Sequence, residues 1–161
     1  MLDITERAIR ASFVNCTQGE AKRLAVPTDL DARPWDDLDF FGWRDPAATQ
    51  RAYLVAEADN GLVGVALRVA PQAARVRRSM CSLCLTTHTG DGVSLMTARK
   101  AGRDGRQGNS VGVYICSDLA CSLYLRGRKH AGRRLDETIT VEEKITRTRV
   151  TLDAFLRRVV E

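Results

Sequence analysis

The chain has 161 residues and a formal net charge of +5, from 25 basic and 20 acidic side chains. This length suits one domain with its own core, and the apolar fraction of 44% excludes a chain that is disordered throughout. The longest apolar run, residues 62–67, is too short to cross a membrane, and the charged N-terminus lacks the apolar core of a signal peptide, so we expect a cytoplasmic protein with no membrane partner.

Two short helices are predicted at the N-terminus. Asp3 and Glu6 have the spacing of a capping box and predict a helix that runs to about Val14. A second helix is predicted over residues 18–25 and is ended by the proline that follows. Together they predict an N-terminal helical extension over residues 1–26.

Residues 27–50 are predicted to be a loop rich in aspartate and aromatic side chains. Four of the nine aromatic residues in the chain gather here: Trp35, Phe40, Phe41 and Trp43. Aromatic rings at this density favour a core plug that covers one end of a sheet, and a ligand-binding cluster is the alternative.

A first hairpin is predicted in the middle of the chain. Residues 52–58 and 62–70 are largely apolar and flank Asn60-Gly61, a dipeptide typical of tight hairpin turns.

A second hairpin and two helices are predicted in the second half. Residues 93–98 and 111–115 predict its strands, and its glycine-rich and basic tip, residues 100–110, reads as an exposed mobile loop. A helix is predicted over residues 118–127, and Thr140 begins a capping box that opens an amphipathic helix to the C-terminus. The predicted fold class is therefore α+β, a small antiparallel sheet with packed helices.

Four of the five cysteines occur as two close pairs. Cys81 and Cys84 form a CxxC, and Cys116 and Cys121 form a CxxxxC. Four thiolates suit one structural Zn²⁺ ion, which takes soft sulfur ligands in tetrahedral geometry. The first pair belongs to a tight knuckle, and the second straddles a strand end and the first turn of a helix, which predicts a treble-clef zinc finger.

Other uses of these thiols are less consistent with the sequence. A redox CxxC pair lacks the βαβ pattern that normally surrounds it, and disulfides are disfavoured in a reducing compartment. His88 lies close to Cys84 and is a possible substitute ligand, but we expect it at the surface or beside the ligands. Cys16 stands alone and is predicted to be a small buried apolar residue.

The positive charge is concentrated in the middle of the chain. Residues 68–134 hold 13 basic and 3 acidic side chains, whereas the flanks carry net charges of −4 and −1. Such a patch indicates an anionic partner, and a solvated face without a partner is the alternative. The predicted contact residues are Arg99, Lys100, Arg103, Arg106, Arg126, Arg128, Lys129, Arg133 and Arg134.

The sequence contains no recognisable catalytic constellation. It lacks HExxH and HxE motifs, and its glycines at 102, 105 and 108 have no strand-to-helix context for phosphate binding. We therefore expect a protein that is not an enzyme and has no small-molecule substrate.

The cysteine block carries a resemblance to a known family. The relevant stretches are Cys81-Ser-Leu-Cys84, Val113-Tyr-Ile-Cys116-Ser-Asp-Leu-Ala-Cys121-Ser and Arg126-Gly127. They resemble the C-terminal treble-clef zinc finger of the elongation factor G-binding proteins, which are the FusB-type fusidic-acid-resistance proteins and their relatives. The stretch from Trp35 to Trp43 is similar to the lead-in of that domain, so the predicted finger domain spans residues 27–161.

The resemblance implies a bacterial cytosolic protein with zinc on Cys81, Cys84, Cys116 and Cys121. It implies an adaptor that binds elongation factor G or the ribosome and promotes release of the factor. The resistance proteins carry a helical bundle where this chain has residues 1–26, so binding is implied but fusidic acid resistance is not. Zinc-dependent binding of RNA or DNA is the alternative function, and a thiol-based redox sensor is a third.

Overall fold

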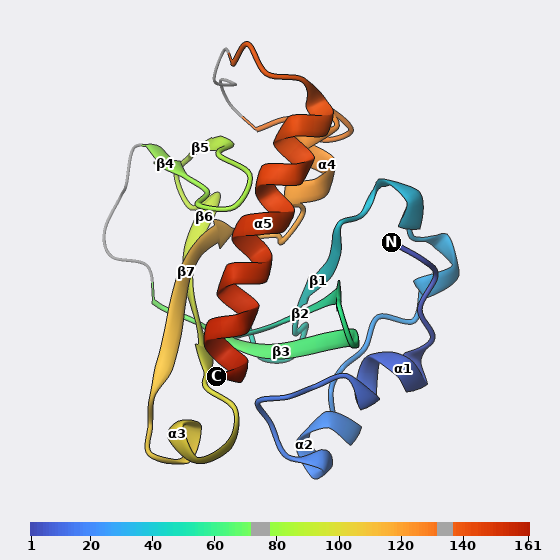
Figure 1. The fold of residues 1–161 in the computed structure, drawn as a ribbon, viewed down its shortest axis with the longest axis vertical. Coiled ribbons are helices and arrows are strands. Elements are labelled where there is room, and N and C mark those ends of the chain that lie inside the picture. Colours follow the sequence, from blue (N-terminus) through green and yellow to red (C-terminus); the bar gives the residue numbers. More distant parts are fainter. Residues whose placement is uncertain (72–77, 132–136) are drawn as a thin grey trace.

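The computed structural model describes residues 1–71, 78–131 and 137–161 (Figure 1). A five-stranded antiparallel sheet, in the order β1-β2-β3-β6-β7, is accompanied by a two-stranded sheet of β4 and β5. The helices are α1 (Glu6–Ala11), α2 (Gln18–Lys22), α3 (Gly102–Arg106), α4 (Cys121–Leu125) and α5 (Val141–Val160), with single 3₁₀ turns at Leu30–Ala32 and Trp35–Asp37. The strands are β1 (Phe40–Arg44), β2 (Arg51–Ala58), β3 (Gly61–Val69), β4 (Arg78–Met80), β5 (Thr87–Thr89), β6 (Val93–Arg99) and β7 (Ser110–Cys116). The predicted α+β class is confirmed.

The two faces of the five-stranded sheet are covered by different parts of the chain. Side chains alternate along β2, so Ala52 and Leu54 join the core cluster that includes α5, whereas Tyr53 and Val55 join the cluster formed with the N-terminal segment. Figure 1 shows α5 lying along one side of the sheet and α1 and α2 near its other side. In the described part of the chain, no helix combines the length and apolar composition that a membrane crossing requires.

Both predicted hairpins are present. β2 pairs with β3 around a turn at Asp59 and Asn60, and β6 pairs with β7 from Val93↔Cys116 to Arg99↔Ser110. The tip of the second hairpin is predicted to be an exposed mobile loop. Most of residues 100–110 are exposed, but the loop assignment is wrong because the tip holds helix α3. Gly105 of α3 is buried, and a Cβ at this position would lie 1.8 Å from the carbonyl oxygen of Lys100. The tip is therefore a packed turn that requires glycine.

The prediction of a loop over residues 27–50 missed strand β1. This strand lies along the edge of the sheet and pairs with β2 over its whole length, from Phe40↔Ala56 to Arg44↔Ala52. Its aromatic side chains alternate between the faces, so Phe40 packs in the α5 cluster while Phe41 and Trp43 pack in the N-terminal cluster. The aromatic group is core, as expected, but it belongs to both faces of the sheet and does not plug one end.

The N-terminal helices are shorter than predicted. Helix α1 is capped by Thr5 rather than Asp3, and it ends at Ala11. Beyond it the backbone pairs with β3, because Gly64 donates to the carbonyl of Ser12 and Val14 donates to the carbonyl of Gly64. This pairing with a strand far along the chain replaces the last predicted helical turn. Helix α2 ends at Lys22, before the predicted end, and has a capping box at Thr17.

The C-terminal helix matches its prediction closely. Thr140 accepts a hydrogen bond from the Glu143 backbone, and the Glu143 side chain accepts one in return from the Thr140 backbone. Thr148, Leu152 and Phe155 lie on the buried face of α5. The predicted helix over residues 118–127 is the shorter α4, whose first residue is Cys121.

The capping box of α5 gives the first testable prediction. Replacing Thr140 with Ala should lower the free energy of unfolding by about 1 kcal/mol, since it leaves a helix N–H group without its acceptor. A thermal or urea unfolding curve measures this loss. Thr146→Ala is the matched control, because the Thr146 hydroxyl donates only to the exposed Glu142 carbonyl within the same helix. A loss as large in the control would contradict a specific role for the cap.

Candidate metal centre

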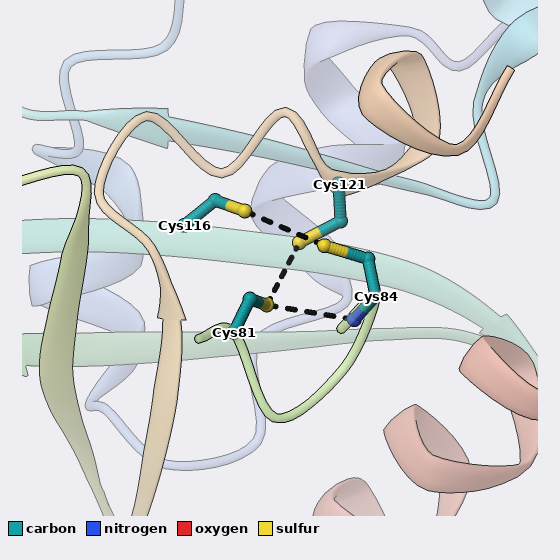
Figure 2. A group of neighbouring side chains, drawn as sticks. All are labelled: Cys81, Cys84, Cys116 and Cys121. Carbon is teal, nitrogen blue, oxygen red and sulfur yellow. Dashed lines mark hydrogen bonds between the residues drawn. The ribbon is translucent and has the colours of Figure 1, made fainter. Parts of the chain in front are cut away.

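Four cysteine side chains from separate parts of the chain point toward one another (Figure 2). Cys81 and Cys84 come from the turn between β4 and β5, Cys116 ends β7, and Cys121 begins α4. All four are buried, and their sulfur atoms all lie within 4.8 Å of one another. The Cys81 and Cys121 sulfurs are 3.6 Å apart, and those of Cys84 and Cys116 are 3.5 Å apart.

Two tight turns wrap the backbone around this cluster. In the first turn, the Leu85 N–H donates to the Cys81 carbonyl, and in the second the Leu119 N–H donates to the Cys116 carbonyl. Within the described ranges, Leu85 (φ 56°) and Leu119 (φ 59°) are the non-glycine residues with a left-handed backbone. Such a backbone costs a branched side chain about 1–2 kcal/mol, so both turns hold their shape only with support from their surroundings.

The sulfur positions fit one Zn²⁺ ion. Tetrahedral zinc with bonds of about 2.3 Å to sulfur places its ligands about 3.8 Å apart, close to the separations found here. None of the five cysteines takes part in a disulfide. A set of four sulfur ligands leaves zinc no open position for water, so the ion is structural. The predicted ligand residues are thus brought together, and one structural zinc is the cofactor that their geometry supports.

The protonation of the cluster is linked to the metal. Burial raises the pKa of the Cys121 thiol, and the neighbouring sulfurs raise it further. In contrast, a hydrogen bond with Cys116 lowers the pKa of Cys84. Zinc binds cysteine as thiolate, so zinc must displace the remaining thiol protons as it binds.

Comparison with known proteins agrees with this geometry. The family model of the FBP C-terminal treble-clef zinc-finger matches residues 8–159. The chain belongs to this family. The match takes in much of the N-terminal segment as well as the finger, and it confirms the family predicted from the cysteine block. No curated protein and no solved structure matches the chain.

His88 lies beside the ligands of this treble-clef finger. It is only 5% exposed, and its Nε2 is 3.2 Å from the Cys116 sulfur. Of the two positions expected for His88, at the surface or beside the ligands, the structure shows the second. Cys16 is half-buried rather than fully buried, so its predicted core position is wrong, and its partial burial raises the pKa of its thiol.

The predicted contact cations of this FBP-type finger fall into two separate groups. Arg99, Lys100, Arg103 and Arg106 lie at or near α3, whereas Arg126, Arg128 and Lys129 follow α4. Figure 1 places α3 and α4 at opposite ends of the β6–β7 hairpin. Arg133 and Arg134 lie outside the described residues. The structure does not bring the predicted set together on one small patch.

The group after α4 is engaged within the protein. Arg126 makes two hydrogen bonds to the fully buried carboxylate of Asp39, at 2.6 and 3.1 Å, and Arg149 of α5 makes a third at 2.8 Å. Burial alone would raise the pKa of Asp39, but the guanidinium groups of Arg126 and Arg149 outweigh it and hold that pKa below its usual range. Lys129 likewise pairs with Asp118 at 2.6 Å. Arg126 therefore joins α4 to the sheet and is poorly placed to meet a partner.

The structure shows a further exposed surface that the sequence did not predict. On the sheet face that packs against the N-terminal segment, some side chains of β3, β6 and β7 stay partly or largely exposed. We name this surface the open sheet face, and its residues are Arg68, Leu95, Thr97, Arg99 and Tyr114. Leu95 lies opposite Tyr114, and Thr97 lies opposite Arg68. Tyr114 is 55% exposed. The sequence predicts a strand over residues 111–115. Which part of the sheet stays uncovered depends on where the N-terminal segment packs.

Proposed function

We propose that this protein is a zinc-built adaptor that binds elongation factor G, without catalysis of its own. The observation that supports this proposal is the family match over residues 8–159, together with the closed set of four cysteines. A saturated zinc ion offers no site for substrate or activated water, so its role is to hold the finger in shape. Such an adaptor works in the bacterial cytoplasm and, on the ribosome, assists release of the factor.

The open sheet face and the adjoining hairpin tip are the proposed contact surface. Arg68 and Arg99 lie on this face, and Lys100, Arg103 and Arg106 continue the positive charge onto α3. Arginine binds carboxylates through paired hydrogen bonds, and an exposed tyrosine such as Tyr114 supplies a typical anchor for a protein interface. This combination suits an acidic patch on a protein partner.

A protein partner is favoured over a single-stranded nucleic acid. Stacking of bases requires several exposed aromatic rings along a basic groove. Tyr124, the other tyrosine of the basic region, is only 8% exposed and contacts His88. Tyr114 is thus the one aromatic residue of the open sheet face, which supplies too few platforms for base stacking.

Binding of purified zinc-loaded protein to elongation factor G tests the proposal. Tyr114→Ala and Arg68→Glu should each weaken the affinity about tenfold or more, since they remove an anchor and reverse a complementary charge. Arg158→Glu is the matched control, because it makes the same charge change on α5, on the other side of the sheet. Calorimetry or biolayer interferometry gives the affinities, and the control should stay within about twofold.

The alternative function has a different signature. A nucleic-acid-binding protein would retain naked RNA and lose it steeply as salt rises. If the protein does not bind elongation factor G but retains RNA that nuclease treatment removes, the adaptor proposal is wrong and this alternative is supported.

A further inference from the structure

The histidine beside the zinc ligands is held in a defined orientation by three elements. His88 lies on β5 and pairs with Ser79 of β4. Its ring makes a T-shaped contact with Tyr124 of α4, with ring centroids 4.8 Å apart and planes at 90°. Gly92 presses against the imidazole, since a Cβ at this position would lie 2.6 Å from His88 Nδ1. The ring therefore has little freedom to turn away from Cys116.

The chemistry of the cluster calls for hydrogen-bond donors. Four thiolates and one Zn²⁺ leave two net negative charges in a buried site, and such charge needs donors around it. Cys81 accepts a hydrogen bond from the Cys84 backbone N–H at 3.5 Å, and the Thr86 hydroxyl lies 3.2 Å from the Cys84 sulfur. At Cys116 the corresponding neighbour is His88 Nε2, at 3.2 Å.

We propose that His88 is a positioning residue of the zinc centre, which donates its Nε2–H group to the Cys116 thiolate. The neutral imidazole carries one N–H, and this arrangement assigns it to Nε2. The bond withdraws electron density from the sulfur, which makes Cys116 a weaker nucleophile. It also holds the sulfur in its place in the tetrahedron. His88 therefore slows both the loss of zinc and the attack of oxidants or alkylating agents at Cys116.

A pair of substitutions separates this role from packing. His88→Phe keeps an aromatic ring against Tyr124 but removes the donor, whereas His88→Gln loses the ring and keeps an N–H group near the position of Nε2. Transfer of zinc to a chromogenic chelator should be about tenfold faster in His88→Phe than in the natural protein, and close to natural in His88→Gln. Equal acceleration in both variants, or none in either, would overturn the proposal.

A spectroscopic measurement on the unmodified sequence makes the test independent of variant folding. With cadmium-113 in place of zinc, the His88 Nε2 proton should show a scalar coupling to the metal through the Cys116 sulfur. Absence of that coupling, with the proton visible, would contradict the proposed bond. A large direct coupling between the metal and the His88 nitrogen would contradict it differently, since His88 would then be a ligand.

Discussion

Cys116→Ser is expected to abolish zinc binding and to unfold the finger. The segments joined by the metal are short, with three residues each in β4 and β5 and five in α4. Elements of this length are unstable by themselves, so the metal supplies much of the energy that holds them. Structural zinc contributes about 10–16 kcal/mol of apparent binding free energy in finger peptides, and that energy becomes folding energy. Elemental analysis should fall from about one zinc per chain to none.

The matched control is Cys16→Ser. Cys16 is the one cysteine outside the cluster, so this variant should keep its zinc and its melting transition. Circular dichroism during heating compares the two variants. A Cys116→Ser protein, or a chelator-stripped natural protein, that melts as cooperatively as the zinc-loaded form would refute a structural role for the metal.

Asp39→Asn is expected to destabilise the protein by about 3 kcal/mol at neutral pH, because the largely buried Arg126 guanidinium then loses the carboxylate that balances its charge. The Asp39 side chain is 0% exposed and that of Arg126 is 14% exposed. Asp39 precedes β1, Arg126 follows α4 and Arg149 lies on α5, so this carboxylate joins the sheet to both helices. Urea unfolding measures the loss. Asp153→Asn is the control, since its pair with Arg157 is solvent-exposed and should be worth less than about 1 kcal/mol.

The pH dependence of the Asp39 contribution has a definite sign. The folded-state pKa of Asp39 is lowered, so the ionised carboxylate stabilises the fold at every pH above its unfolded-state pKa. The stability gap between the natural protein and Asp39→Asn should therefore stay constant from about pH 7 to pH 5, and it should shrink below about pH 4 as the carboxyl takes up its proton. A stability gap that already changes between pH 7 and pH 5 would mean that a group other than Asp39 is responsible.

The sequence alone determined the features that depend on neighbouring residues. The capping box at Thr140, the apolar spacing of α5 and the β2–β3 hairpin were all predicted correctly, because each rests on contacts within a few positions. The zinc ligands were also predictable, since CxxC and CxxxxC spacings already place two sulfurs together. The family followed from the same block.

Tertiary structure decided everything that depends on distant pairing. Strand β1 forms because β2 offers its edge, although residues 40–44 lie in a stretch that reads as a loop. Helix α1 stops at Ala11 because the following backbone bonds to β3.

Distant contacts also determine the surroundings of the functional site. Arg126 was predicted to face a partner, but Asp39, 87 positions away, draws it inward, since a buried carboxylate requires a cation. His88 reaches Cys116 only once β5 and β7 are assembled, from 28 positions away. The sequence therefore contained the metal site, and the fold decided which side chains surround it and which surface stays open.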